Sequence, residues 1–357
     1  MPKTPNAFLI TNKPNIAYLS NFTGSAGFML LTKSNKYLFT DFRYIERAKN
    51  TIKKGIKLID ITKLWRNEES LKDSWQKILK KHKIKTLGVE ESNLTVERYK
   101  KFKKISDINN RKVSFTDISG KIEAQREIKS KLEISLIEKS QKINEKTFTL
   151  IKKIIQACLA SNKRITEMDI AWKIKETGYS LGSEEVSFDP IVSFGKHTSQ
   201  PHHSPDNTVL KKGDIILIDM GMKYKGYCSD MTRMIFTKRP TEEQKKIYNL
   251  VLKAQETAIK KIRAGVSGRR ADKYARDIIE KEGYGETFGH GGGHGIGLDI
   301  HETPSLSENY TKKLRENSII TVEPGIYIEG KFGVRIEDMV LVKKTGVKNI
   351  TKIPKKI

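Results

Sequence analysis

Four acidic residues in the second half of the chain lie within runs of apolar residues. Asp219 ends the run IILID, Asp230 lies in CSDMTRMIF, Glu323 ends IITVE and Glu337 lies in VRIED. A carboxylate in an apolar strand is costly to bury unless it is paired or binds a metal ion. Because the pattern recurs four times, it indicates a buried polar centre with acid–base or metal chemistry.

The spacing of Asp219 and Asp230 predicts a hairpin. A turn containing Lys225 and Gly226 separates them, so the second strand returns beside the first and brings the two carboxylates together. Residues two apart in a strand share a face. Asp230 therefore shares its face with Thr232, which we expect to hydrogen-bond to the polar centre.

The same alternation separates two adjacent acids near the C-terminus. Glu337 shares its face with Arg335, whereas Asp338 points the other way. We therefore expect Glu337, and not Asp338, to belong to the polar centre.

A glycine-rich run, GHGGGHGIGLDIHE, adds His290, His294 and His301. Its glycines permit positive φ angles and close backbone approach, but the strand and the acid of a dinucleotide-binding fingerprint are missing. One imidazole with four carboxylates is mainly a hard oxygen site, which favours Mn²⁺, with Co²⁺, Zn²⁺ or Fe²⁺ as alternatives. Four carboxylates are too many for one ion, so we expect two divalent metal ions, about 3.5–4 Å apart.

With these residues in place, the sequence resembles the aminopeptidase P/prolidase branch of the creatinase-related M24 metallopeptidases. The resemblance covers nearly the whole chain, including NIAYLSNFTGSAGFML and TDFRYIERA near the N-terminus. It implies that five residues bind metal, in the contexts IDMG, SDMTR, GHGIG, VEPGIY and VRIED: Asp219, Asp230, His294, Glu323 and Glu337.

The resemblance also implies a role for each of these ligands. Asp219 binds one metal, His294 and Glu323 bind the other, and Asp230 and Glu337 bridge the two. A water or hydroxide between the ions is the implied nucleophile, and Glu323 is the implied general base.

Further catalytic residues follow from the same resemblance. His202, in SQPHHSP, matches a histidine that contacts the developing oxyanion or shuttles protons, whereas its neighbour His203 has no expected chemical role. His301 and Arg335 match positions beside the ligands or the substrate, as does His290. For the two histidines a structural hydrogen bond is an alternative, and for Arg335 a plain ion pair with a carboxylate of the cluster is another.

The elements that must position these residues suggest two domains. Short apolar runs and helical patterns alternate over residues 1–120, which predicts a small α/β domain of the creatinase type. Residues 121–357 combine β-rich runs with long helical patterns and predict an α+β catalytic domain, for which the resemblance implies the pita-bread fold. Helix starts are expected at Ser130, Thr166 and Thr241 because each has a capping partner three residues later.

Composition limits the remaining functions. The 357 residues are 37% hydrophobic and 31% charged, and Cys158 and Cys228 form no spacing motif. Without a secretory segment or an apolar run of about 20 residues, we expect a cytoplasmic protein that does not enter membranes. The net charge of +26 comes from lysines spread along the chain, so we expect no specific nucleic-acid partner.

The expected function is hydrolysis of the bond between an N-terminal residue and proline, by a homodimer. The partners would be small peptides with proline at the second position. Alternatives are a methionine aminopeptidase-like exopeptidase, which the extra N-terminal domain, PHHSP and GVRIED oppose, and a non-catalytic pita-bread binding protein, which the intact ligands oppose. A creatinase is disfavoured because that branch does not retain this metal set. The choice between Xaa-Pro dipeptidase and Xaa-Pro aminopeptidase stays open.

Overall fold

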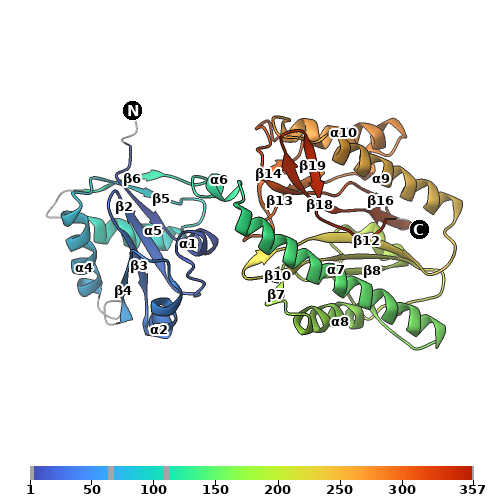
Figure 1. Ribbon diagram of the computed structural model, residues 1–357, viewed down its shortest axis with the longest axis horizontal. Coiled ribbons are helices and arrows are strands. Elements are labelled where there is room, and N and C mark those ends of the chain that lie inside the picture. The colour runs from blue at the N-terminus through green and yellow to red at the C-terminus, as the bar shows by residue number, and fades with distance from the viewer. Residues whose placement is uncertain (1–3, 63–67, 108–111, 356–357) are drawn as a thin grey trace. The chain divides into compact units, whose positions relative to one another are not determined.

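The computed structural model describes residues 4–62, 68–107 and 112–355, and it separates into two compact units (Figure 1). The first unit is Met1–Arg126 and the second is Glu127–Ile357. Each has its own hydrophobic core, and each is considered by itself below.

The first unit is a six-stranded sheet with helices, the small α/β domain expected from the sequence. The strand order is β4-β3-β2-β1-β5-β6, with parallel outer pairs and an antiparallel centre. Its strands are β1 Ala7–Ile10, β2 Phe28–Thr32, β3 Lys36–Thr40, β4 Ile56–Asp60, β5 Thr86–Val89 and β6 Ser114–Asp117. Its helices are α1 Lys13–Ser20, α2 Phe42–Thr51, α4 Glu68–Lys81, α5 Val96–Ser106 and α6 Glu123–Arg126.

One of the short apolar runs in this unit, residues 16–19, is helical and not extended. The side chain of Asn12 caps helix α1 by accepting a hydrogen bond from the Asn15 N–H, and Pro14 lies in the first turn. Both features favour a helix start. The local capping signal therefore outweighs the apolar run.

Four long helices frame the second unit: α7 Lys131–Ala160, α8 Glu167–Ser180, α9 Glu242–Lys261 and α10 Gly268–Lys281. The three predicted helix starts are confirmed, since Ser130, Thr166 and Thr241 each form a capping box with the residue three positions on. In Figure 1, α7 and α8 lie on one side of the strands and α9 and α10 on the other. This is the mixed α+β architecture that the sequence predicts.

The strands of the second unit form four small sheets. Their orders are β11-β10-β7, β12-β9-β8, β14-β13-β15-β18-β19 and β16-β17. Their bounds are β7 Glu185–Val186, β8 Ile191–Phe194, β9 Ile215–Met220, β10 Met222–Tyr224, β11 Tyr227–Cys228, β12 Met231–Phe236, β13 Gly293–Gly295, β14 Glu302–Leu306, β15 Ile319–Val322, β16 Gly325–Ile328, β17 Phe332–Arg335, β18 Asp338–Lys343 and β19 Gly346–Asn349.

Strand β9 shows how the core aims the first carboxylate. Ile216 and Ile218 pack into the cluster formed by α7 and α8, whereas Ile215 and Leu217 pack into the cluster formed by α9 and α10. Because side chains alternate along a strand, Asp219 points to the same side as Ile215 and Leu217. The apolar residues of this strand therefore aim Asp219 at the side of the sheet that faces α9 and α10.

The predicted hairpin is also present. Strand β9 pairs antiparallel with β12, and Asp219 lies opposite Thr232. The tight turn uses positive φ at Lys225 (48°) and Gly226 (79°), as a two-residue hairpin loop requires. Asp230, directly before β12, is thus carried back beside Asp219.

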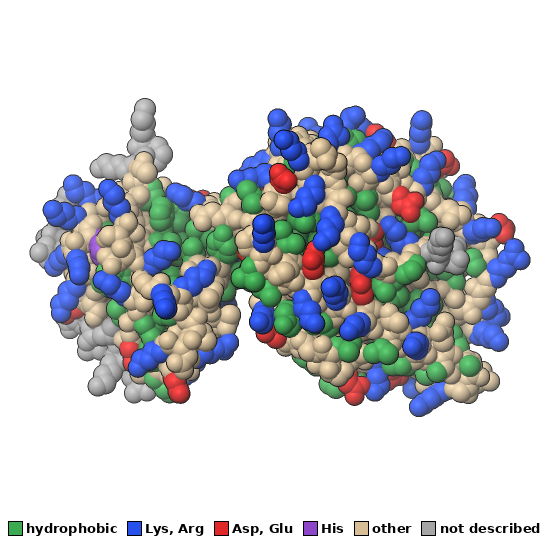
Figure 2. All heavy atoms as spheres, viewed as in Figure 1, with side chains coloured by type: hydrophobic (Ala, Val, Ile, Leu, Met, Phe, Trp, Pro, Cys, Tyr) green, Lys and Arg blue, Asp and Glu red, His purple; other side chains and the backbone are tan. Residues whose placement is uncertain are grey.

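Lysine and arginine side chains are scattered over the face of the molecule shown in Figure 2, with acidic side chains among them. This matches the spread of lysines along the sequence. Within the described residues, no helix has both the length and the apolar character needed to cross a bilayer.

Candidate metal centre

The five expected ligands come from five separate places in the second unit. Asp219 lies in β9 and His294 in β13, whereas Asp230 precedes β12, Glu323 follows β15 and Glu337 falls between β17 and β18. Three of the carboxylates are therefore at strand breaks and not inside strands as the apolar runs suggested. A break frees the residue from the regular alternation of the ladder, so that acids from different sheets can converge.

Three of the expected carboxylate ligands have a buried oxygen atom that lacks a hydrogen-bond partner among the described residues. One oxygen atom each of Asp219, Asp230 and Glu337 is buried and has no hydrogen-bond partner within the described part of the chain. Ligand atoms of Asp230, Glu337 and His294 all lie within 4.8 Å of one another. Buried polar atoms are normally satisfied, so this arrangement fits divalent cations as the missing partners.

His294 presents a free nitrogen to the same centre. Its Nδ1 lies 3.0 Å from the Gly295 carbonyl and donates its hydrogen there. The other nitrogen, Nε2, lies 3.3 Å from Glu323 Oε1 and 3.6 Å from Asp230 Oδ2. A carbonyl that holds the Nδ1 hydrogen leaves Nε2 available as a metal ligand.

Burial and mutual repulsion both disfavour the ionised form of the carboxylates in this centre. Burial, followed by the charges of Glu337 and Asp219, raises the pKa of Asp230 well above its usual range. Burial, followed by Glu323 and Asp219, does the same to the pKa of Glu337. Burial also raises the pKa of Glu323. Cations would relieve this repulsion and keep the carboxylates ionised.

Arg335 donates hydrogen bonds to three residues in and beside the centre. It donates to Asp219 Oδ2 at 2.6 Å, to Thr232 Oγ1 at 3.0 Å and to the Tyr327 hydroxyl at 2.8 Å. Thr232 in turn donates to Glu337 at 2.8 Å, as a residue that supports a ligand would. Arg335 is therefore ion-paired with a carboxylate of the cluster.

His290 lies on the far side of the same tyrosine. Its Nε2 is 2.9 Å from the Tyr327 hydroxyl and its Nδ1 is 2.8 Å from the Gly291 carbonyl. Burial raises the pKa of Tyr327 to about 12, so the phenol keeps its proton. Arg335, Tyr327 and His290 thus form one hydrogen-bonded row beside the carboxylates.

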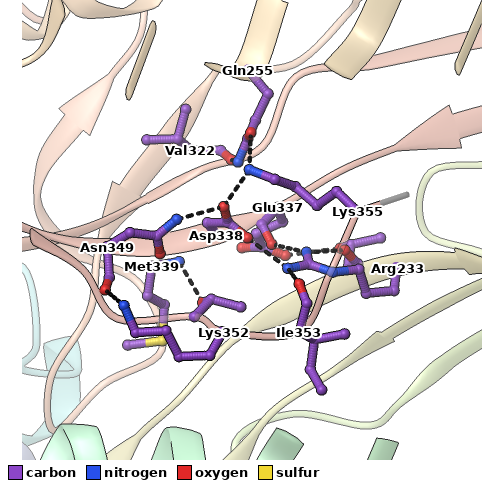
Figure 3. Close-up of polar contacts among 12 residues, drawn as sticks. Arg233, Gln255, Val322, Glu337, Asp338, Met339, Asn349, Lys352, Ile353 and Lys355 are labelled. Atoms are coloured by element: carbon purple, nitrogen blue, oxygen red, sulfur yellow. Dashed lines mark hydrogen bonds and ion pairs between the residues drawn. The ribbon is translucent and has the colours of Figure 1, made fainter. Parts of the chain in front are cut away.

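Behind the centre, Asp338 faces away from the cluster, as expected, although Glu337 before it lies outside a strand. Arg233, Asn349 and Lys355 converge on its carboxylate at 2.7, 2.8 and 2.7 Å (Figure 3). Arg233 also donates to the Glu337 carbonyl at 2.5 Å, which fixes the backbone beside that carboxylate.

The C-terminal segment extends this support to a second acid. Lys355 donates to Gln255 Oε1 at 2.8 Å, and Gln255 lies 3.4 Å from the Val322 carbonyl, one residue before Glu323 (Figure 3). One lysine near the end of the chain therefore connects the backbones that carry Glu323 and Glu337.

The expected catalytic histidines lie at the open side of the centre. His202 and His301 are both exposed. The His301 ring lies 4.5 Å from the ring of the proposed ligand His294. His202 follows Pro201, whose carbonyl accepts a hydrogen bond at 3.2 Å from Arg335, the partner of Asp219. His203, by contrast, is buried and turned away, 2.7 Å from Glu167.

Sequence reasoning missed three residues that support the site: Tyr327, Arg233 and Glu167. Arg233 lies inside the apolar run MTRMIF, so the argument used for the carboxylates would have found it. Tyr327 and Glu167 carry no such signal. A tyrosine in an apolar strand and a glutamate in a first helical turn are ordinary by type.

The fold and the site together define a metal-dependent hydrolase of the pita-bread class. Residues 135–344 match metallopeptidase family M24, and residues 3–128 match the Creatinase/Prolidase N-terminal domain. The chain belongs to metallopeptidase family M24, among its metallo-exopeptidases.

Two solved structures and one further relative show the extent of the similarity. An Xaa-Pro dipeptidase from Bacillus anthracis is 37% identical, with a TM-score of 0.90 and coverage of 99% of this chain and 94% of that one. An X-Pro aminopeptidase from Thermotoga maritima is 36% identical, with a TM-score of 0.87 and coverage of 99% and 97%. An Xaa-Pro dipeptidase of Pyrococcus horikoshii is 35% identical over 357 residues, 99% of this chain and 94% of that protein.

Proposed function

We propose that this protein hydrolyses the peptide bond between an N-terminal residue and proline, using two divalent cations. The observation that carries the proposal is the set of buried carboxylate oxygens without partners, beside an imidazole nitrogen that is free to bind metal. Relatives whose names specify Xaa-Pro substrates support the choice of substrate.

In this proposal the cations are held in a shared arrangement. Asp219 would hold one, His294 and Glu323 would hold the other, and Asp230 and Glu337 would be shared by both. The oxygen-rich ligand set favours Mn²⁺, with Co²⁺, Zn²⁺ or Fe²⁺ as alternatives. When bound, the cations supply the positive charge that lowers the pKa of the attacking water and polarises the scissile carbonyl.

The chain's own residues then handle protons and charge. Glu323, ionised beside the cations, would accept the proton of the attacking water. His202, exposed at the open side, donates a hydrogen bond to the carbonyl oxygen as negative charge gathers there. Arg335 holds Asp219 in place, and His301 lines the substrate side of His294.

Dipeptidase and aminopeptidase activities are both compatible with this site. The relatives include both kinds at nearly equal identity, 37% and 36%. A methionine aminopeptidase-like activity is the second candidate, because that reaction uses the same ligand types. The N-terminal unit matches the Creatinase/Prolidase N-terminal domain, which favours hydrolysis of Xaa-Pro bonds.

The compartment and the assembly belong to the same proposal. Cys158 and Cys228 are both free thiols, and burial raises the pKa of Cys228 to about 11, so it is an inert neutral group. Free thiols suit a reducing compartment. We propose a cytoplasmic homodimer that acts on small peptides.

A metal-reconstitution assay tests this function. The protein is stripped with a chelator, loaded with Mn²⁺, Co²⁺ or Zn²⁺, and assayed with Ala-Pro and Ala-Pro-Ala. We expect no cleavage by the stripped protein and recovery with metal, and the preferred peptide separates dipeptidase from aminopeptidase. Full cleavage by metal-free protein would contradict the proposal.

A further inference from the structure

Glu167, which begins helix α8, is fully buried and lies outside the metal centre. Its carboxylate accepts four hydrogen bonds from the last residue of β8 and the segment that follows it. The donors are Phe194 N at 2.7 Å, His197 Nδ1 at 3.0 Å, His203 Nε2 at 2.7 Å and Asp206 N at 3.2 Å. One buried side chain therefore holds a segment of thirteen residues at both of its ends.

The same residues have the types of a metal site, but their hydrogen bonds oppose that reading. An ionised carboxylate offers about four acceptor positions, and here four N–H groups occupy them. The histidine nitrogens that face Glu167 carry the donated hydrogens and are not free to bind a cation. Asp206 is exposed. The cluster is thus an anchor for the backbone and not a second metal centre.

The anchored segment carries His202. On one side of His202, the Pro201 carbonyl accepts a hydrogen bond from Arg335 at 3.2 Å. On the other side, His203 is held by Glu167. Further back, Thr198 accepts a hydrogen bond from the Gly333 N–H at 2.9 Å. His202 therefore projects from a backbone that is fixed immediately before and after it.

We propose that Glu167 is a positioning residue that sets the place of His202 relative to the substrate carbonyl. The inference rests on the proposed role of His202. A donor to a developing oxyanion must be held close to its productive position. His202 is exposed and lies in a turn between Gln200 and His203, so its position depends on restraint from the residues around that turn. The buried carboxylate of Glu167, which accepts four hydrogen bonds, supplies that restraint through its bond to His203.

The test compares three variants with the wild type. Glu167→Gln is nearly isosteric, but it replaces one accepting oxygen by an NH₂ group. That group faces N–H donors and cannot accept their hydrogen bonds. His203→Leu removes one of the four donors and serves as the milder second variant if Glu167→Gln does not fold. The matched control is Asp169→Asn, in the same first turn of α8, where Asp169 caps the helix through Thr166 and is bonded to nothing in the loop.

Hydrogen exchange followed by mass spectrometry gives a readout independent of activity. We expect the peptide spanning residues 194–206 to exchange faster in Glu167→Gln and His203→Leu than in wild type. In Asp169→Asn the change should be confined to the start of α8. Unchanged exchange of the loop in Glu167→Gln would overturn the proposal even if the protein proved to have another activity.

A double-mutant cycle links the anchor to His202. With Ala-Pro-Ala as substrate, Glu167→Gln should lower kcat roughly tenfold to a hundredfold at nearly constant KM, with both metals retained. His202→Ala should lower kcat about a hundredfold to a thousandfold, and adding Glu167→Gln to it should cost little more. Additive losses would show that Glu167 serves stability alone and would overturn the proposal. Failure of the wild type to cut any proline peptide would instead contradict the proposed function.

Discussion

Among single residues, the two carboxylates proposed to be shared by both cations should have the largest effect on metal binding. Asp230→Ala and Glu337→Ala should each lose both ions, because each removes a ligand shared by the two. Elemental analysis of the purified variants measures this. His301→Ala, which alters no proposed ligand, is the control and should keep both ions. Two ions still bound in Asp230→Ala would contradict the bridging role.

Titration of the same residues gives a second prediction. In metal-free protein the pKa values of Asp230, Glu337 and Glu323 are raised from ordinary values of 3.8, 4.5 and 4.5. Raised carboxyl pKa values mean that the folded state holds protons which the unfolded state has released. The stability of metal-free protein should therefore fall as pH rises from about 4–5 through the raised pKa values.

Thermal unfolding of metal-free protein across this pH range, with and without Mn²⁺, measures the effect. Added metal should remove most of the loss, since cations favour the ionised carboxylates. A metal-free protein whose stability rose steadily over the same range would show that the carboxylates are not mutually repelling in the folded state.

At the scale of elements, strand β13 carries His294 between two neighbours. A Cβ added at Gly295 would lie 2.3 Å from the Thr303 carbonyl oxygen and 2.8 Å from that of Glu302, so backbone must shift. Gly295→Ala should therefore destabilise the fold by about 1–3 kcal/mol and weaken metal binding through its neighbour His294.

Gly289 is the matched control in the same glycine-rich run, because a Cβ there meets nothing within 4 Å. Gly289→Ala should change stability by less than about 0.5 kcal/mol. Denaturation midpoints and metal affinities of the two variants make the comparison. Equal behaviour of both would refute the close packing of β13.

The sequence allows the elements to be predicted where the information is local. The capping boxes at Ser130 and Thr241 and the hairpin turn at Lys225 were predictable from residues a few positions apart. The strand breaks at Glu323 and Glu337 were not predictable, because an apolar run does not indicate where the hydrogen bonds between strands stop. Nor was the anchor at Glu167, since its partners lie 27–39 positions away.

At the scale of the whole molecule, a buried ion pair joins segments far apart in the chain. Arg233 and Asp338 are both nearly inaccessible, and Lys355 completes the group from the C-terminal segment. Arg233→Met should cost about 3–5 kcal/mol of stability, because it leaves a buried carboxylate short of its partner. It should also weaken metal binding, since Arg233 holds the Glu337 carbonyl.

Lys352→Met supplies the comparison for this group. Lys352 is exposed, and its amine donates to the nearby Asn349 carbonyl at 2.6 Å. We expect its loss to be nearly neutral, whereas Lys355→Met should lower both the denaturation midpoint and the affinity for metal. Equal effects of the two lysine variants would show that the C-terminal segment does not support the centre.

The proposed function predicts that the metal-loaded enzyme is selective for proline at the second position. Values of kcat/KM are measured with Ala-Pro-Ala, Ala-Pro and Met-Ala-Ala at one metal concentration. We predict that the better proline peptide is preferred over Met-Ala-Ala by at least about tenfold, which corresponds to roughly 1.4 kcal/mol in transition-state stabilisation. Equal or faster cleavage of Met-Ala-Ala would contradict the proposed Xaa-Pro hydrolysis and favour a methionine aminopeptidase-like activity.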